Sequence, residues 1–276
     1  MVDYTRAHER IEEGVYPGLH FTLDDLLERS VDVYLPEAHR AADSVALLIH
    51  FHGAAFVPMH AVHTAVSPYL LAVVNLGSGS SVYERPFTDP ATLPRLLAAL
   101  DAVLAQHLEA PPRRAGVYVS AFSAGYGAVR ALLRHDATFE AVDGVLLLDG
   151  LHTDYVPART TLAEGGRLDS TKMAPFLRLA RAAMQGERRF LFTHSEIFPG
   201  TYASTTETAD FLLHHLGLRR TPVLRWGPVG MQQVSEAGAG RFAVLGFAGN
   251  TAPDHVDHFH ALPAFLERLA QGALTL

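Results

Sequence analysis

The sequence predicts an α/β fold in which a mostly parallel central sheet is flanked by helices. Short apolar runs such as Val45–Phe51 and Val145–Leu148 have the length and composition of buried strands. Val45–Phe51 is apolar on both faces, as is expected of a central parallel strand that helices cover. Between such runs lie helical patterns such as Pro90–Leu108, whose leucines recur on one face.

Composition narrows the class of protein. The 276 residues predict a single domain, 1–276, with a core over about 31–272, and a hydrophobic content of 49% is enough to build that core. The net charge of −7 gives no electrostatic support to nucleic-acid binding, and no cysteine is present for disulfide or thiolate chemistry. No stretch is long and apolar enough to form an integral membrane segment. Residues 1–10 lack the plan of a signal peptide, so we expect a cytoplasmic protein, or a secreted or periplasmic one if a signal peptide was removed.

The first half of the chain alternates strands with loops and helices. Strands are predicted over Val31–Leu35, Val45–Phe51 and Leu70–Leu76. The second of these strands runs into a turn of small residues, His52-Gly53-Ala54-Ala55. Gly77–Ser81 is predicted as a flexible loop, and Asp89 as the cap of the helix that starts at Pro90. We expect His50 and His52 to pack and form hydrogen bonds at the end of their strand.

The stretch Gly116–Leu133 joins a predicted strand to a predicted helix through a serine. Val117–Ala121 is apolar and β-branched, and Ala128–Leu133 is a run of helix formers. Ser123 lies between them, with Ala121 two residues before it and Gly125 two residues after. A serine on such a sharp turn has the geometry of a nucleophile elbow, where small neighbours let the helix pass close to the strand. The alternative is a serine that caps an ordinary helix.

These residues resemble the G-x-S-x-G motif of the α/β-hydrolase superfamily, here in the form A-x-S-x-G. His52-Gly53-Ala54-Ala55 resembles the H-G-G-G segment of esterases and lipases, with alanines at two glycine positions. The resemblance follows the element order from about Val31 to the last helix. It implies an α/β-hydrolase fold in which Ser123 is the nucleophile. It also implies an oxyanion site beside Gly53, built from the N–H of Ala54 or Ala55 and the N–H of Ala124.

Two acidic residues compete for the acid of a Ser-His-Asp/Glu triad. Asp149 follows Val145–Leu148, at the carboxyl end of a predicted parallel strand, where the sites of α/β proteins gather. Glu196 follows the predicted strand Phe190–Thr193 and stands near the more common acid position of the superfamily, although some lipases use the earlier strand. A turn aspartate before Gly150 is the plain alternative for Asp149, so the sequence leaves the acid open.

The superfamily carries its histidine in the loop after the last strand, here predicted as Phe242–Phe247. His255 is the preferred base, because it lies nearest that loop and just beyond Pro253, a proline typical of a first helical turn. His258 is the second choice for the base. His260 is expected to lie at the surface or to support the site.

The remaining segments carry structural signals. Residues 152–188 stand where the superfamily often inserts a cap, and their shortness predicts a small or absent cap around the helix Met173–Gln185. Ser204-Thr205-Thr206-Glu207 is a capping box, so these hydroxyl groups are predicted to cap the helix that ends near Leu216. Pro222–Ser235 is predicted as a hairpin that turns at Gly227-Pro228, and Ala261–Ala270 as the final helix.

Two other functions compete with the serine hydrolase. The cluster Asp254–His260 is rich in metal ligands, and His50 and His52 add imidazoles, so a metal-dependent hydrolase is one alternative. However, the chain has no H-E-x-x-H motif, and His50-Phe51-His52-Gly53 does not continue into an H-x-H-x-D-H run. A non-catalytic relative that only binds a ligand is the other alternative.

The sequence therefore predicts a serine esterase or lipase-like enzyme. It would cleave carboxylic esters through an acyl-enzyme intermediate, with a small-molecule or polymeric ester as its partner and no cofactor. The same residues serve ester, thioester, amide and polyester cleavage, and they do not define the substrate, the acyl-chain preference or the oligomeric state.

Overall fold

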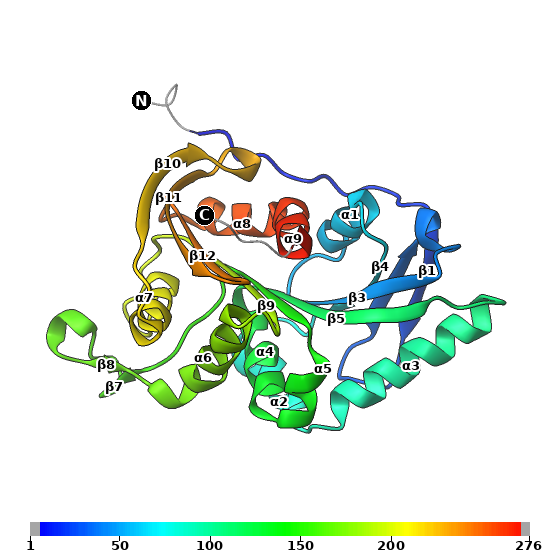
Figure 1. Ribbon diagram of the computed structural model, residues 1–276, viewed down its shortest axis with the longest axis horizontal. Coiled ribbons are helices and arrows are strands. Elements are labelled where there is room, and N and C mark those ends of the chain that lie inside the picture. The colour runs from blue at the N-terminus through cyan, green and yellow to red at the C-terminus, as the bar shows by residue number, and fades with distance from the viewer. Residues whose placement is uncertain (1–5, 272–276) are drawn as a thin grey trace. The chain divides into compact units, whose positions relative to one another are not determined.

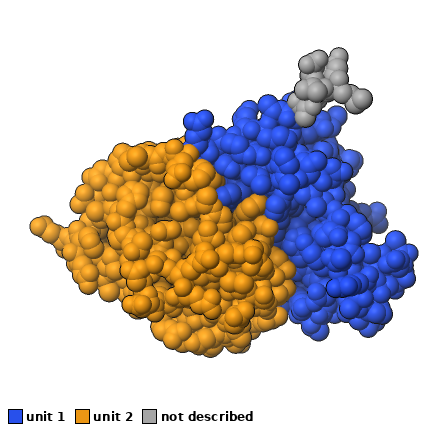
Figure 2. All heavy atoms as spheres, turned by 180° about the vertical axis from the view of Figure 1, so that it is seen from behind, with its two compact units in different colours: residues 1–12, 147–276 blue, residues 13–146 orange. Residues whose placement is uncertain are grey.

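Residues 6–271 are described in the computed structural model, and the chain forms two compact units (Figure 1). Unit 1 comprises residues 1–12 and 147–276, and unit 2 comprises residues 13–146; Figure 2 colours them blue and orange. The chain passes from unit 2 to unit 1 within strand β6 (Gly144–Leu148). The last residue of the predicted core, Gly272, and residues 1–5 of the N-terminus lie outside the described residues.

Unit 2 is built on parallel strands with an antiparallel outer edge. Its strands lie in the order β1 (Gly18–Leu23), β2 (Val31–Pro36), β4 (Tyr69–Val74), β3 (Ser44–Phe51) and β5 (Arg113–Phe122). Strand β3 pairs in parallel with β4 and β5, whereas β1 and β2 pair antiparallel. Residues of β4 are buried along its whole length, which agrees with the apolar composition of a covered central strand.

Helices cover both faces of the unit 2 strands. Figure 1 shows α1 (Phe56–Thr64) on one side, and α2 (Ser80–Phe87), α3 (Thr92–His107), α4 (Tyr126–Arg134) and α5 (Asp136–Ala141) on the other. Two short 3₁₀ turns, η2 (Glu37–His39) and η3 (Ser123–Gly125), follow β2 and β5. Leu93, Leu96, Leu100 and Leu104 are buried, so the predicted apolar face of the long helix is confirmed.

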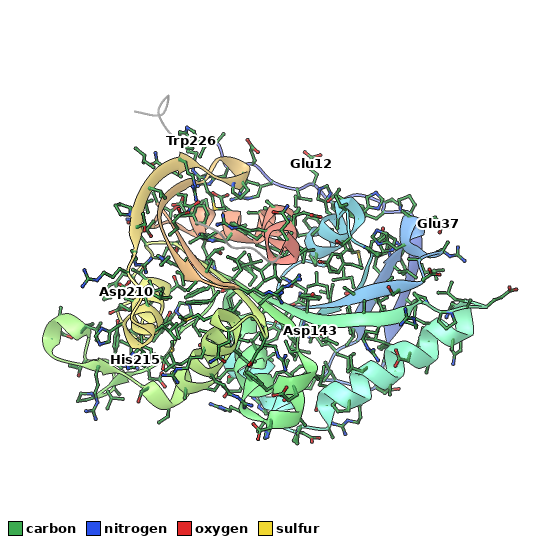
Figure 3. All side chains as sticks on the ribbon, in the orientation of Figure 1. Glu12, Glu37, Asp143, Asp210, His215 and Trp226 are labelled. Carbon is green, nitrogen blue, oxygen red and sulfur yellow. The ribbon has the colours of Figure 1, made fainter. Side chains whose placement is uncertain are left out.

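Unit 1 has the same plan, with parallel strands inside and an antiparallel hairpin outside. Strands β9 (Arg189–His194) and β12 (Phe242–Phe247) pair in parallel, and β11 (Gln232–Ala239) and β10 (Thr221–Trp226) extend them antiparallel. The predicted hairpin is thus confirmed, with the 3₁₀ turn η5 (Pro228–Gly230) between its strands. Trp226, at the end of β10 in Figure 3, is 72% exposed.

Among the described residues, four helices flank the strands of unit 1. Figure 1 shows α8 (Ala252–His260) and α9 (Leu262–Gln271) on one side, and α6 (Ser170–Met184) and α7 (Thr205–Leu216) on the other. Within residues 6–271, no helix combines the length and apolar character that crossing a lipid bilayer requires.

The structure differs from the sequence predictions in local boundaries. Ser80 and Ser81, predicted in a flexible loop, begin helix α2. Helix α3 starts at Thr92 rather than Pro90, because Asp89 accepts a hydrogen bond from the N–H of Ala91 (3.0 Å) and holds the chain in a turn before the helix. The segment 152–188, where a small or absent cap is predicted, contains helix α6 and the two-stranded hairpin of β7 (Tyr155–Val156) and β8 (Arg167–Leu168), joined through η4 (Leu162–Glu164); whether it forms a cap stays a prediction.

Candidate active site

Ser123 stands on a strained turn between strand β5 and helix α4. Strand β5 ends at Phe122, and Ser123 has a φ of +47°, a region that residues other than glycine rarely enter. The chain then forms η3 and continues directly into α4. A strained serine on a strand-to-helix turn is the geometry of a nucleophile elbow, in which the side chain is turned out of the regular structure.

The small residues around Ser123 are explained by close backbone approaches. A Cβ atom at Gly125 would collide with the carbonyl oxygen of Phe51 on β3, and one at Gly127 would collide with the carbonyl oxygen of Ser80. Ala121, which replaces the first glycine of the usual motif, is fully buried and lies beside Phe51 in the parallel register. An alanine methyl group is accommodated there, whereas the position of Gly125 excludes any side chain.

The turn after β3 is strained as well. His52 has a φ of +72° and Gly53 a φ of +119°, and helix α1 begins at Phe56. Helix geometry leaves the first N–H groups of a helix without partners inside the helix. Ala54 and Ala55 lie directly before the first residue of α1, and Ala124 lies in η3, shortly before α4. Their N–H groups therefore stand at the starts of helices, where oxyanion sites take their backbone donors.

His50 and Tyr83 hold this turn from two sides. The Nε2–H of His50 donates to the carbonyl oxygen of His52 (2.9 Å), and its Nδ1 accepts from the hydroxyl group of Ser120 (2.7 Å). Burial lowers the pKa of His50 to about 3, so its imidazole is neutral. The Tyr83 hydroxyl group lies 2.8 Å from Nδ1 of His52 and also contacts the N–H groups of Leu76 and Gly77. The prediction that His50 and His52 pack and form hydrogen bonds is therefore confirmed.

In unit 1, Asp149 is a buried carboxylate that accepts several hydrogen bonds. Its donors are the N–H of Ser195 (2.9 Å), the hydroxyl groups of Ser195 (2.7 Å) and Thr205 (2.7 Å), and Nδ1 of His255 (2.7 Å). Burial raises the pKa of Asp149, but the nearby histidines His258 and His255 and the hydrogen bonds outweigh burial and lower it well below its ordinary value. Asp149 is therefore ionised at neutral pH.

Helix α8 brings His255 to this carboxylate. The helix begins with a capping box, in which Thr251 and Asp254 satisfy each other's backbone N–H groups, and Pro253 lies in its first turn as predicted. Because a carboxylate only accepts hydrogen bonds, the 2.7 Å contact places the His255 proton on Nδ1. The neutral imidazole then has its lone pair on Nε2, which is the tautomer that a general base requires.

The other candidates for acid and base have different partners. Glu196 lies with its carboxylate 3.4 Å from the N–H of Gly249. His258 is fully buried, with Nδ1 2.8 Å from the Thr193 hydroxyl group. His260 accepts a hydrogen bond at Nδ1 from the N–H of Ile11 (2.9 Å). Of the predicted acids and bases, Asp149 and His255 are the pair that a hydrogen bond joins in the described part of the chain, residues 6–271.

Two residues of this network, Thr205 and Ser195, were not predicted from the sequence. Thr205 is predicted only to cap α7, but its hydroxyl group donates to Asp149, while Ser204 is the capping residue. Ser195 stands between His194 and Glu196 and has no predicted role. Its position directly after β9 was an available signal, since the carboxyl ends of neighbouring parallel strands meet at one edge of a sheet.

The ligand-rich segment Asp254–His260 does not converge on one point. His255, His258 and His260 have separate partners, as described above. In residues 6–271, the candidate metal ligands that come within 4.8 Å of one another are His8, Asp254 and Asp257. Arg6 pairs with both carboxylates and Arg10 pairs with Asp257, so the positive charge that a metal ion would supply is already present.

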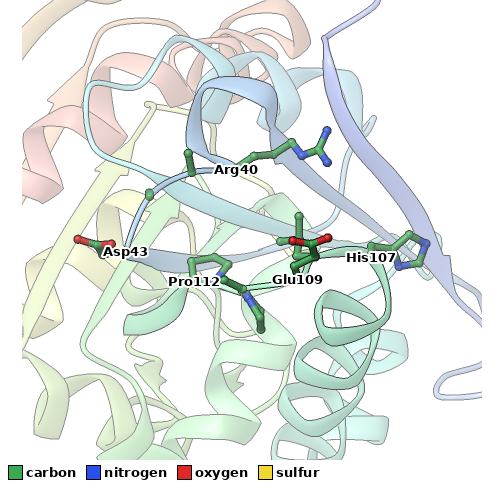
Figure 4. Close-up of a pocket in the computed structure, with 10 residues that line it drawn as sticks. Arg40, Asp43, His107, Glu109 and Pro112 are labelled. Carbon is green, nitrogen blue, oxygen red and sulfur yellow. The ribbon is translucent and has the colours of Figure 1, made fainter.

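An open groove of about 660 Å³ lies elsewhere in unit 2 (Figure 4). Residues 40–43 and 107–112 line it, next to the first residues of β3 and β5. His52 and Ser123 follow the last residues of the same two parallel strands. The groove is therefore at the opposite edge of these strands from the two strained turns.

Comparisons with known proteins agree on the fold. No protein-family model matches the sequence, and no curated protein matches it. Similar solved structures include a thermostable esterase, with 14% identity and a TM-score of 0.51. They also include the ferric enterobactin esterase of Salmonella typhimurium, with 13% identity and a TM-score of 0.51. The S-formylglutathione hydrolase of Agrobacterium tumefaciens has 11% identity and a TM-score of 0.50.

The likeness extends over most of the chain. The three matches cover 92%, 95% and 97% of this chain, and 62%, 60% and 99% of the respective structures, so the chain spans less than two thirds of the first two. At these identities the likeness shows the fold. The chain therefore has the α/β-hydrolase fold, and the predicted fold class is confirmed.

Proposed function

We propose that the protein is a serine hydrolase that cleaves carboxylic esters, with Ser123 as nucleophile, His255 as base and Asp149 as acid. The observation that carries this proposal is the hydrogen bond between His255 and a buried, ionised Asp149. The strained backbone at Ser123 supports the role of nucleophile independently. The α/β-hydrolase fold, shared with the esterases above, is consistent with this chemistry.

In the first half of the proposed reaction, the Ser123 oxygen attacks the carbonyl carbon of the ester, and Nε2 of His255 takes the hydroxyl proton. The carbonyl oxygen becomes an oxyanion, which accepts hydrogen bonds from the N–H of Ala124 and the N–H of Ala54 or Ala55. Asp149 keeps the His255 proton on Nδ1 and stabilises the imidazolium. The ester C–O bond then breaks, and the alcohol leaves with the proton from His255.

In the second half, water replaces the alcohol. His255 takes a proton from the water, whose oxygen attacks the carbonyl carbon of the acyl-enzyme. The bond from that carbon to Ser123 breaks, the serine recovers its proton from His255, and the carboxylic acid leaves. These steps balance without a metal ion or an organic cofactor.

The test compares variants on p-nitrophenyl esters of short and long acyl chains. We expect Ser123→Ala to lower kcat at least about 1,000-fold, because the nucleophile is lost. His255→Ala should match that loss, whereas His258→Ala should retain more activity, since His258 contacts Thr193. A fluorophosphonate probe should label the wild-type protein and fail to label Ser123→Ala.

Other outcomes would contradict the proposal in distinct ways. Full activity of Ser123→Ala would exclude Ser123 as nucleophile. Loss of activity on chelation, together with full activity of Ser123→Ala, would indicate a metal-dependent hydrolase. A wild-type protein that hydrolyses no ester and takes no label would be a binding protein with this fold.

A further inference from the structure

The residues before the first strand form an extended segment that lies along helix α8. We call Arg6–Ile11 the N-terminal strap; it has no helix or strand of its own. The strap and α8 both belong to unit 1, although almost 250 residues separate them in the sequence. The strap carries three basic side chains at alternate positions, Arg6, His8 and Arg10, and none of them belongs to the proposed triad.

Asp257 is the centre of the contact between the strap and α8. Its side chain is fully buried, and it accepts hydrogen bonds from the guanidinium groups of Arg6 and Arg10 and lies 2.9 Å from Nδ1 of His8. Burial alone would raise the pKa of Asp257, but the hydrogen bonds from the strap lower it below its ordinary value. A buried carboxylate without such partners is costly, so the strap is what allows Asp257 to be charged there.

Further bonds run along the helix from its start to its end. Arg6 also donates to Asp254 (2.8 Å), and Arg10 to the carbonyl oxygen of Pro253 (3.0 Å). At the other end, the N–H of Ile11 donates to Nδ1 of His260 (2.9 Å). The strap therefore contacts α8 over its whole length rather than at one point.

Two faces of α8 have different contact partners. Asp254, Asp257 and His260 recur every third residue, so they share one face of the helix, which the strap contacts. His255 and His258 project from another face and contact Asp149 and Thr193. Helix α8 is thus fixed between the strap and the network around Asp149. A shift of the helix on the strap side would move the imidazole on the other side.

We propose that the N-terminal strap is a positioning segment, which holds α8 so that the imidazole of His255 stays aligned with Asp149. This inference rests on the proposed function, in which His255 is the base. The strap residues bond to Pro253, Asp254, Asp257 and His260 of α8, so they would act through the helix. Their effect should therefore appear in kcat rather than in KM, because a small misplacement of a catalytic group slows the chemical step more than substrate binding.

The experiment is a double-mutant cycle in the full-length chain. Arg10→Ala, Asp257→Asn and the combined variant are assayed on a p-nitrophenyl ester, together with Arg10→Lys, which keeps the charge but not the planar donor group. The matched control is Arg95→Ala, since Arg95 forms an exposed ion pair with Asp89 in unit 2. Proton NMR of the Nδ1–H of His255 reports directly on the bond to Asp149, and thermal unfolding defines the temperature at which every variant is folded.

Each outcome decides the role of the strap. We expect Arg10→Ala and Asp257→Asn each to lower kcat by roughly 10-fold with little change in KM. The combined variant should be little worse than Asp257→Asn alone, because the bond between Arg10 and Asp257 is lost in both. Arg10→Lys should recover part of the loss, and Arg95→Ala should behave as wild type. Broadening or loss of the His255 proton signal should accompany the loss of kcat.

Wild-type kcat and an unchanged proton signal in the folded Arg10→Ala variant would overturn the proposal and leave the strap a stabilising element only. Absence of the signal from the wild-type protein would overturn it as well, since the bond to be aligned would not exist in solution. If the wild-type protein cleaves no ester, the proposed function fails by itself. The NMR signal of the strap variants then still decides whether the strap positions His255.

Discussion

Three residues of the candidate site have unusual backbone angles. His52, Ser123 and Asp149 each have a positive φ, and each directly follows a strand, β3, β5 or β6. Such angles cost on the order of 1 kcal/mol or more for residues with a side chain, so they persist where the surrounding structure enforces them. The strain at Asp149 accompanies a carboxylate that is fixed by Ser195, Thr205 and His255.

The identity of the acid can be tested by substitution of single residues. Asp149→Asn should lower kcat by roughly 1,000-fold or more, because a neutral amide neither fixes the His255 tautomer nor stabilises the imidazolium. Glu196→Gln should keep activity close to that of the wild type, since Glu196 contacts the N–H of Gly249. Steady-state kinetics of both variants measure the difference. The opposite ranking would make Glu196 the acid.

At the scale of elements, helix α2 links two loops of unit 2. Its Tyr83 is fully buried, and the hydroxyl group contacts His52 from the turn after β3 and residues 75–77 from the loop after β4. Glu84 on the same helix pairs with the nearly buried Arg130 of α4, the helix that follows Ser123. Helix α2 therefore supports both strained turns of unit 2.

Removal of one hydroxyl group tests this support. Tyr83→Phe removes the hydroxyl group that contacts Nδ1 of His52 and the N–H groups of Leu76 and Gly77, so we expect a loss of about 1–3 kcal/mol in the free energy of unfolding. If the turn supplies the oxyanion donors, kcat should fall as well. The matched control is Tyr34→Phe, which removes another buried hydroxyl group, bonded to Pro17 and His63. Equal kcat in the two variants would mean that Tyr83 stabilises the fold without supporting the turn.

The sequence predicted some elements of this site better than others. Ser123 and its turn were predictable, because a strand, small residues and a helix follow one another within Gly116–Leu133. The acid that partners His255 was not predictable, because Asp149 and Glu196 both follow strands. The hydrogen bonds that distinguish them, from His255 to Asp149 and from Gly249 to Glu196, join residues that are distant in sequence. Helix α2 was missed for a local reason: Gly77–Ser81 has the composition of a loop, and its serines begin the helix through packing against α4.

Both units of the molecule should be destabilised by acid, because each contains a buried neutral histidine. Burial lowers the pKa of His50 in unit 2 to about 3, and burial, with the charge of Arg220, lowers that of His194 in unit 1 to about 3. Both imidazoles accept hydrogen bonds that need the neutral form, from Ser120 and Arg220 respectively. Neither unit can therefore protonate its buried histidine without losing a contact.

The stability of the protein should depend on pH in two stages. Between about pH 6.5 and pH 3 the unfolded chain binds protons at these histidines and the folded chain does not, so the free energy of unfolding should fall as the pH falls. Below pH 3.8, the ordinary pKa of an aspartate, the unfolded chain also binds protons at carboxylates whose pKa is lowered in the folded chain, such as Asp149 and Asp257. Their contribution to the free energy of unfolding is then lost as well. Thermal unfolding from pH 7 to pH 3 measures both stages.

A histidine variant separates the two stages of this acid response. His50→Gln should make the decline above pH 4 less steep, because glutamine does not titrate and His194 remains, and it should leave the steeper fall below that pH in place. His215→Gln is the matched control, since His215 is exposed on α7 and bonds only locally, to the carbonyl oxygen of Phe211 (2.8 Å). If His50→Gln and the control show the same slope as the wild type between pH 6.5 and pH 4, protonation of His50 does not limit stability. The decline above pH 4 would then depend on other buried histidines such as His194.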